Sequence, residues 1–171
     1  MAKFANTALD VDANFKPIYR GEFPFRTKKT ITFAGATADE WGNDGGALDG
    51  GVMFTVTGLV MVKMLAACST SLTGATATLS VGITGDTAIF LPVETATEID
   101  AGQIWLNDAA NATYGIVGEE AAAADNLPEY ILNGNDIIMT IATADVETGV
   151  LDFYVLWQPI SDDANLVDSG N

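Results

Sequence analysis

Strict alternation of apolar and polar side chains constrains the fold of this chain more than any other feature. The clearest example runs from Ala75 to Thr84, where every second residue is apolar and its neighbours are small or polar. One face would carry Ala77, Leu79, Val81 and Ile83, and the other Thr76, Thr78, Ser80 and Gly82. Because successive residues of a strand point to opposite faces, this pattern predicts a strand with one packed and one polar face.

Other segments show a similar pattern between turn residues. We predict strands at 30–33, 52–67, 75–84, 88–93, 136–143 and 150–157, with short edge pieces at 97–100 and 103–106. In the second of these, Gly58 predicts a bend or bulge. The run after it is apolar on both faces, which indicates burial on both, for example between the sheets and a subunit interface. A helix over 59–67 is the alternative there, and a turn or two of helix is expected at 119–124.

About seven or eight short strands, long Gly-rich loops and almost no helix predict an all-β fold. A β-sandwich, jelly-roll-like in topology, is the leading form, with an extended N-terminal arm. We divide the 171 residues into a basic and aromatic arm at 1–26, a sandwich domain at 27–160 and a flexible acidic tail at 161–171.

Charge is unevenly placed along the chain. The net charge is −16, from 23 acidic and 7 basic residues. The first 29 residues hold six basic residues against three acidic ones, a net charge of +3, and the other 142 hold Lys63 against 20 acids, a net charge of −19. So acidic a body repels nucleic acid and anionic membranes, and we predict that it binds neither. The basic arm predicts docking on an acidic surface, either of another protein, of a neighbouring subunit or of its own body.

The sequence lacks the residues on which most catalytic chemistry depends. It has no histidine and a single cysteine, Cys68, so Ser-His-Asp and Cys-His mechanisms, thiolate zinc sites and intrachain disulfides are excluded. No phosphate-binding glycine motif is present. Paired carboxylates remain, but a chain this acidic brings some pair to glycosidase spacing by chance. We therefore predict a protein that is not an enzyme and has no cofactor.

Oxygen-bearing side chains gather in the Gly/Asp-rich loop at 34–51. They are Asp39, Glu40, Asn43, Asp44 and Asp49. Hard cations such as Ca²⁺ prefer ligands of this kind, although the spacing does not match the EF-hand pattern. We predict an ordinary loop without a metal, and a structural calcium stays open as the alternative.

Aromatic side chains mark the segments expected to contact a partner. Trp157 is predicted to lie in the core, Trp105 is ambiguous, and Trp41 in its polar loop is the best candidate for a contact, because aromatic anchors often dominate interfaces. The arm mixes aromatic with basic residues, which is unusual for a free tail. The predicted contact residues are Phe15, Tyr19, Arg20, Phe23, Phe25, Arg26, Lys28, Lys29 and Trp41.

A stretch within 31–104 resembles the capsid decoration, or cement, proteins of tailed bacteriophages. The resemblance is carried by the short arm, the Gly/Asp loop and the phrase DGGVMFTVTGLVMVKMLAACSTSLTGATATLSVGITGDTAIFLP. It implies homo-oligomers, with trimers favoured, that bind the major capsid protein on the capsid exterior and bridge capsomers. It supplies no catalytic residues.

Three other functions remain as alternatives. They are a tail, neck or fibre-base β module of the virion, a carbohydrate-binding β-sandwich, and a hydrolase that uses paired acids. No segment resembles a signal peptide, and the longest apolar stretch, 59–68, is interrupted by Lys63 and is too short to span a bilayer. We therefore expect synthesis in the host cytoplasm.

Overall fold

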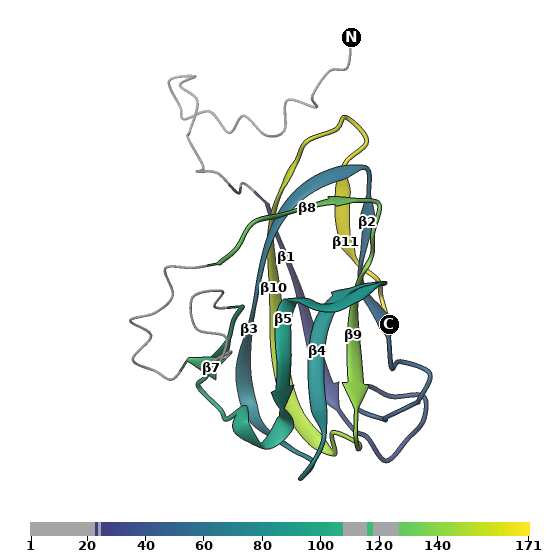
Figure 1. Ribbon diagram of the computed structural model, residues 1–171, viewed down its shortest axis with the longest axis vertical. Helices are drawn as coiled ribbons and strands as arrows, with labels where there is room; N and C mark the ends of the chain where they lie inside the picture. The colour runs from purple at the N-terminus through teal and green to yellow at the C-terminus, as the bar shows by residue number, and fades with distance from the viewer. Residues whose placement is uncertain (1–22, 24, 108–115, 118–126) are drawn as a thin grey trace.

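The computed structural model describes residues 23, 25–107, 116–117 and 127–171, and it confirms the predicted all-β sandwich (Figure 1). One antiparallel sheet has six strands, with β1 (Phe25–Phe33), β10 (Thr148–Pro159), β3 (Leu59–Thr73), β6 (Ile104–Trp105) and β7 (Ile116–Val117) in that order and β8 (Tyr130–Asn133) also paired with β3. The other has five, in the order β11 (Asn165–Asp168), β2 (Gly51–Thr57), β9 (Ile137–Ala142), β4 (Thr78–Ile83) and β5 (Asp86–Thr95). A short 3-10 helix, η2 (Ala96–Glu98), follows β5.

The chain changes sheet at most of its connections, and Gly58 makes the sharpest of these changes. It joins β2 of one sheet to β3 of the other with a φ of +66°. A Cβ atom there would lie 2.6 Å from both Asp163 Oδ1 and Ser161 Oγ, so only glycine fits this corner. The residues after it form a strand, which rules out the alternative of a helix over 59–67.

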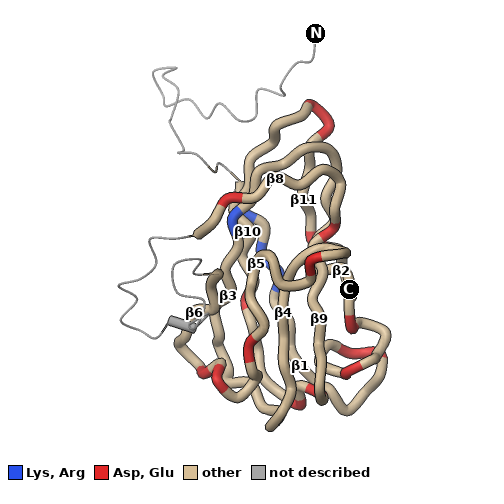
Figure 2. The backbone as a smooth tube through the Cα atoms, in the orientation of Figure 1, with Lys and Arg blue, Asp and Glu red and all other residues tan. Residues whose placement is uncertain are grey.

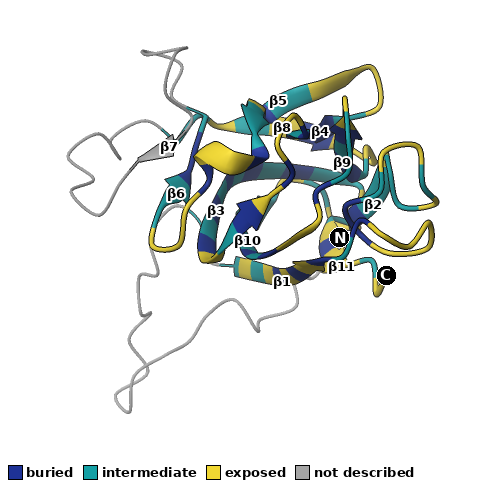
Figure 3. Cartoon of the chain, turned by 90° about the horizontal axis from the view of Figure 1, so that it is seen from below, coloured by how far each residue is buried: buried dark blue, intermediate teal, exposed yellow. Residues whose placement is uncertain are grey.

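The core lies between the two sheets and is built by the alternation that the sequence predicts. Figure 3, which looks along the strands, shows β1, β10 and β3 in one layer and β5, β4 and β9 in the other. Leu79 and Val81 of β4 face Phe153 and Val155 of β10 as fully buried members of one cluster. Each large apolar side chain buried in this way contributes about 1.5–3 kcal/mol. Trp157 is buried as predicted, and Trp105, the ambiguous one, is also buried.

Both ends of the predicted sandwich domain need correction. The first strand begins at Phe25 and takes the last two residues of the segment assigned to the arm. At the other end, the segment expected to be loose contains β11, which pairs with Phe54–Thr57 of β2 and buries Leu166. The first two residues of the edge piece expected at 97–100 belong to η2, and the helix expected at 119–124 lies outside the described residues.

Candidate interaction face

Alternation along three neighbouring strands gives the six-stranded sheet a second side that faces away from the core. We call this side the outer face. Its central residues are Arg26, Lys28 and Thr30 of β1, Asp152, Tyr154, Leu156 and Gln158 of β10, and Met61, Lys63, Leu65 and Ala67 of β3. Ile131 of β8 extends it, because this residue pairs with Met61. None of these side chains is fully buried, whereas the alternate residues of β3 and β10 are.

Strand register places these side chains in mixed rows of cations and apolar groups. In one row Arg26 lies opposite Leu156, which lies opposite Lys63. In the next row Lys28 lies opposite Tyr154, which lies opposite Leu65. Directly opposite residues in a sheet have Cβ atoms about 5 Å apart, so each row is a continuous strip of contacts. Leu156 therefore lies between two cations, and Tyr154 lies between a cation and a leucine.

Tyr154 of β10 lies beside two cations of β1. The Arg26 Cζ atom lies 5.9 Å from the centroid of its ring, and the Lys28 Nζ atom lies 5.5 Å from it. Both distances fall within the range of cation–π attraction. On β3, Lys63 Nζ lies 4.7 Å from the ring centroid of Phe23 and 2.8 Å from Glu129 Oε1.

An ion pair fixes the position of Lys28. Its Nζ atom lies 2.9 Å from Asp152 Oδ2, and the Thr30 hydroxyl donates to Asp152 Oδ1 at 2.6 Å. The hydrogen bond from Thr30 and the bond and charge of Lys28 outweigh partial burial and lower the pKa of Asp152. The same carboxylate raises the pKa of Lys28, which stays charged. One acid thus holds the ammonium group beside Tyr154 on the sheet surface.

Apolar side chains on the outer face are left partly open to water. Ile131 is 61% exposed, and Ile160, just after β10, is 39% exposed. Met61, Leu65 and Leu156 are half-buried although no second layer of described strands covers them. Contiguous apolar area rimmed by polar and charged groups is typical of protein interaction sites. The outer face therefore has the composition of a protein-binding surface.

The positive charge of the described chain is confined to this sheet. All four described basic residues, Arg26, Lys28, Lys29 and Lys63, belong to β1 and β3. The five strands of the other sheet, all of them described, contain no Lys or Arg. In Figure 2 the Lys and Arg positions fall in one group near β10, whereas the acidic positions are spread over both loops and strands.

The predicted contact residues divide into three groups. Phe15, Tyr19 and Arg20 lie outside the described residues. Phe23, Arg26 and Lys28 lie at or on the outer face. Phe25, Lys29 and Trp41 make contacts within the chain: Phe25 stacks on Trp157 with 4.7 Å between ring centroids, and the other two are buried. The structure thus places Lys29 and Trp41 in the body of their own chain, where the sequence suggests a partner contact.

Lys29 is turned inward and links the two sheets. Its side chain is 3% exposed, and its Nζ atom donates to Asp168 Oδ1 at 2.6 Å and to the Asn171 carbonyl oxygen at 2.7 Å. Burial raises the pKa of Asp168, but the bonds from Lys29 and from the Gly170 backbone, with the lysine charge, outweigh it and hold this pKa below its ordinary value. The pair joins β1 to β11.

Some residues of the outer face could not be predicted from the sequence. Tyr154, Leu156 and Lys63 are not among the predicted contacts, because a single side chain gives no sign of what lies on the next strand. The available signal is the segment 59–67, apolar on both faces, for which a sheet buried on both sides is expected. This signal identifies the strand but not the residues opposite it.

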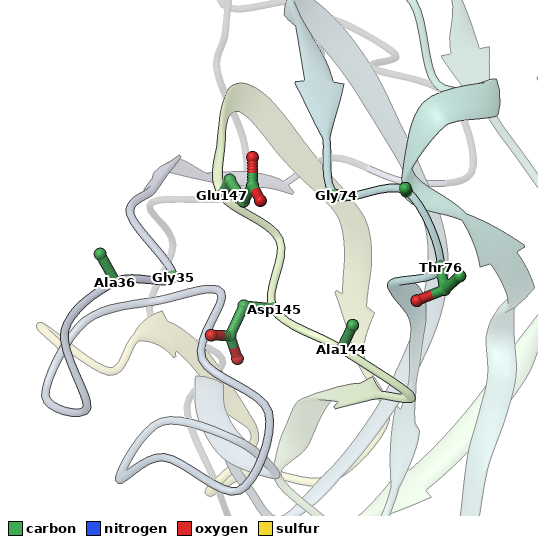
Figure 4. Close-up of a pocket in the computed structure, with 8 residues that line it drawn as sticks. Gly35, Ala36, Gly74, Thr76, Ala144, Asp145 and Glu147 are labelled. Carbon is green, nitrogen blue, oxygen red and sulfur yellow. The ribbon is translucent and has the colours of Figure 1, made fainter.

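A hollow of about 610 Å³ lies among three loops at one end of the sandwich. Figure 4 shows Asp145 and Glu147 on one loop, between Gly35 and Ala36 on one side and Gly74 and Thr76 on the other. Asp145 Oδ1 accepts a hydrogen bond from the Asp44 backbone at 2.8 Å, so it holds the neighbouring loop in place. The lining contains no aromatic side chain on which a sugar ring could stack, and all three tryptophans are buried.

The oxygen ligands of the 34–51 loop are used by the protein itself. Asp49 accepts hydrogen bonds from the backbone of Gly45 and, at 2.9 Å, from that of Ile141. The Asn43 amide donates to the Gly35 carbonyl at 2.8 Å. Within the described part of the chain, no group of three or more acidic or cysteine side chains is placed to hold a metal ion.

No helix in the described ranges combines the length and the apolar character needed to cross a membrane. Comparisons with protein-family models, with curated protein sequences and with solved structures found no match to this chain. The outer face and the fold are therefore the features from which a function is inferred.

Proposed function

We propose that this chain is a structural, non-enzymatic virion protein that binds the outer surface of a phage capsid and stabilises it by bridging capsomers. The observation that carries the proposal is the outer face, where half-buried apolar side chains lie between the cations of β1 and β3. The arm that the sequence predicts precedes β1, and we propose that its basic and aromatic residues contribute to the same attachment. Attachment of this kind needs area and complementarity rather than a catalytic pocket.

We also propose that the sandwich is a jelly roll. Support comes from strand order, because β1, β10, β3 and β8 are successive neighbours in one sheet and β2, β9, β4 and β5 in the other. A jelly roll combines two Greek keys in which the chain repeatedly changes sheet, with one hairpin inside a sheet. The hairpin between β4 and β5 occupies that position.

Electron microscopy of virions that contain the protein, labelled with a specific antibody, tests its location. The expected result is label distributed over the capsid shell. Label confined to the tail or neck would favour a tail, neck or fibre-base module instead. Absence of the protein from purified virions would contradict both virion functions.

A deletion tests the role of the arm in attachment. Because β1 begins at Phe25, the deletion should end at residue 22 and leave this strand whole. We expect the shortened protein to bind capsids at least about tenfold more weakly, since it loses one of two linked contacts, while its circular dichroism stays that of the intact sandwich. Unchanged capsid binding would remove the arm from the proposal.

A further inference from the structure

A second hollow, distinct from the outer face, opens beside the end of β1. Its volume is about 420 Å³, and its lining is mostly apolar. Ala34, Trp41 and Leu48 form its less exposed part. Asp39 and Glu40 are exposed at its rim, and Thr32 and Asn171 complete it. We call it the Trp41 hollow. Within the described structure the Trp41 Nε1 atom is buried without a hydrogen-bond partner. Lys29 Nζ lies 6.0 Å from the centroid of the Trp41 ring.

The chemistry of the Trp41 hollow selects an aromatic or aliphatic group next to a cation. The indole ring and Leu48 offer apolar contact, and the two carboxylates attract positive charge. Glu40 accepts a hydrogen bond from the Thr37 hydroxyl at 2.7 Å, which orients one of these carboxylates. Lys29 does not neutralise the rim, because it is paired with Asp168 and Asn171.

We propose that the Trp41 hollow receives the N-terminal arm of a second copy of this chain. The segment 15–20, Phe-Lys-Pro-Ile-Tyr-Arg, combines bulky apolar groups with two cations and so matches an apolar hollow with an acidic rim. Charge favours the contact locally, because segment 15–20 holds Lys16 and Arg20 and no acid, whereas residues 23–171 hold four basic residues against 20 acids, a net charge of −16. An arm of one subunit seated on the next makes a head-to-tail contact, and such contacts form a ring where the rotation between subunits closes.

Phe23, the one described residue before β1, lies away from the hollow of its own subunit. No residue that lines the Trp41 hollow belongs to β10 or β3. Phe23, in contrast, contacts Lys63 of β3, on the far side of β10 from β1. The hollow also lies at the other end of β1, about 26 Å along the strand from Phe25 at about 3.3 Å per residue. To reach the hollow of its own subunit, the arm would have to turn back along the whole length of β1. The arm of a neighbouring subunit does not have to make this turn.

Charge exchange between two variants of the full-length chain tests the proposal. One variant carries Asp39→Lys and Glu40→Lys, which make the rim basic, and the other carries Lys16→Glu and Arg20→Glu, which make the arm acidic. We expect each variant alone to self-associate at least about tenfold more weakly than the unaltered chain in native mass spectrometry and light scattering. In an equimolar mixture the arm of each variant meets a hollow of opposite charge on the other variant, so association should recover, at every contact of a ring with an even number of subunits and at two of the three contacts of a trimer.

A matched control reverses two exposed acids elsewhere on the body, Glu98→Lys and Asp100→Lys, and should leave the oligomer intact. Circular dichroism of every variant checks that the sandwich has folded; if the lysine rim variant does not fold, Asp39→Asn with Glu40→Gln replaces it and should still weaken the oligomer. A monomeric unaltered chain, or rim variants with the unaltered mass, would overturn the proposal. Monomeric variants that fail to recover on mixing would also overturn it, in favour of docking within one chain. None of these measurements uses a capsid, so they stand or fall separately from the proposed attachment.

Discussion

The two sheets present very different outer surfaces to their surroundings. On the five-stranded sheet the side chains that face away from the core are mainly small and polar, such as Thr55, Thr57, Thr78 and Thr140, with exposed valines only on its edge strands β5 and β11, and its strands hold no Lys or Arg. On the six-stranded sheet the equivalent positions hold Tyr154, Leu156, Met61 and Leu65, flanked by cations. Both surfaces belong to one sandwich with one core, so the core does not account for the difference.

Threonine side chains are well suited to the solvent-facing side of a strand, because the β-branched residue favours an extended backbone and its hydroxyl group is hydrated. An apolar and cationic surface leaves area that water covers poorly and that a partner would cover better. Under the proposed function, the five-stranded sheet would face solvent and the six-stranded sheet would contact the capsid. The predictions below test that division, beginning with the largest expected effect.

Neutralising the cations of the outer face should have the largest effect on attachment. In the variant Arg26→Gln, Lys28→Gln and Lys63→Gln, we expect capsid binding to weaken about 100-fold, or about 2.7 kcal/mol. The matched control on the other sheet is Thr57→Glu, Ala142→Glu and Val167→Glu, which alters the net charge by the same amount and should change binding less than about twofold. Co-sedimentation with capsids measures both, and equal losses would erase the distinction between the sheets.

Two acids pair with lysines of β1: Asp168 pairs with the inward-facing Lys29, and Asp152 pairs with the outward-facing Lys28. Removing Asp168 should lower the free energy of unfolding more than removing Asp152. Asp168→Ala leaves the Lys29 ammonium buried with one fewer acceptor, and we expect the free energy of unfolding to fall by about 2 kcal/mol. Asp152→Ala leaves Lys28 free to be hydrated, because this side chain is 43% exposed, and should cost less than about 0.5 kcal/mol. Urea denaturation followed by fluorescence measures both, and the reverse order would contradict the inward role of Lys29.

Truncating the aromatic centre of the outer face should weaken attachment moderately. For Tyr154→Ala we expect about a tenfold loss of capsid binding, since aromatic anchors inside an interface commonly contribute about 1–2 kcal/mol. The matched substitution on the other sheet is Thr140→Ala in β9, also half-buried, which should leave binding unchanged. A Tyr154 variant that binds normally would move the contact away from this part of the face.

The smallest expected effect is on the stability of the protein at low pH. The folded pKa values of Asp152 and Asp168 lie below their ordinary value of 3.8, so these carboxylates bind protons less readily in the folded protein than in the unfolded chain. Their stabilisation is therefore present above about pH 4 and is lost as the pH falls through the folded pKa values. The melting temperature of the Asp152→Asn, Asp168→Asn variant should fall less steeply below about pH 4 than that of the unaltered chain. Parallel curves would show that neither acid is linked to stability.

The strands with a single regular period could be predicted from the sequence. Ala77, Leu79 and Val81 are buried as their alternation indicates, and the segments 136–143 and 150–157 correspond to β9 and β10. In these segments the apolar or polar character of each residue indicates which face of the sheet it lies on, so the strand can be predicted without knowing its neighbours. The sandwich follows from them because two such faces must cover each other.

The remaining features depend on contacts far apart in the chain. The first part of β1 does not look like a strand because Lys29 lies on its inner side, and this lysine is acceptable there only because Asp168, 139 residues away, pairs with it. For the same reason β11, with Leu166 as its one buried side chain, resembles a loose tail. Trp41 looks exposed in its polar loop, yet the loop folds back so that the Ala34 amide donates to the Trp41 carbonyl at 2.9 Å.

The pairing of β1 determines how the protein bears mechanical load. Its nine residues pair one to one with β10, from Phe25 opposite Trp157 to Phe33 opposite Gly149. A pull on the arm along the strand axis strains all these rungs together in shear, whereas a pull away from the sheet at Phe25 opens them one after another. Even that peeling must break the cross-link from Lys29 to the other sheet once the first rungs have opened. A tether drawn along the surface of the sheet is therefore held more firmly than one drawn straight off it.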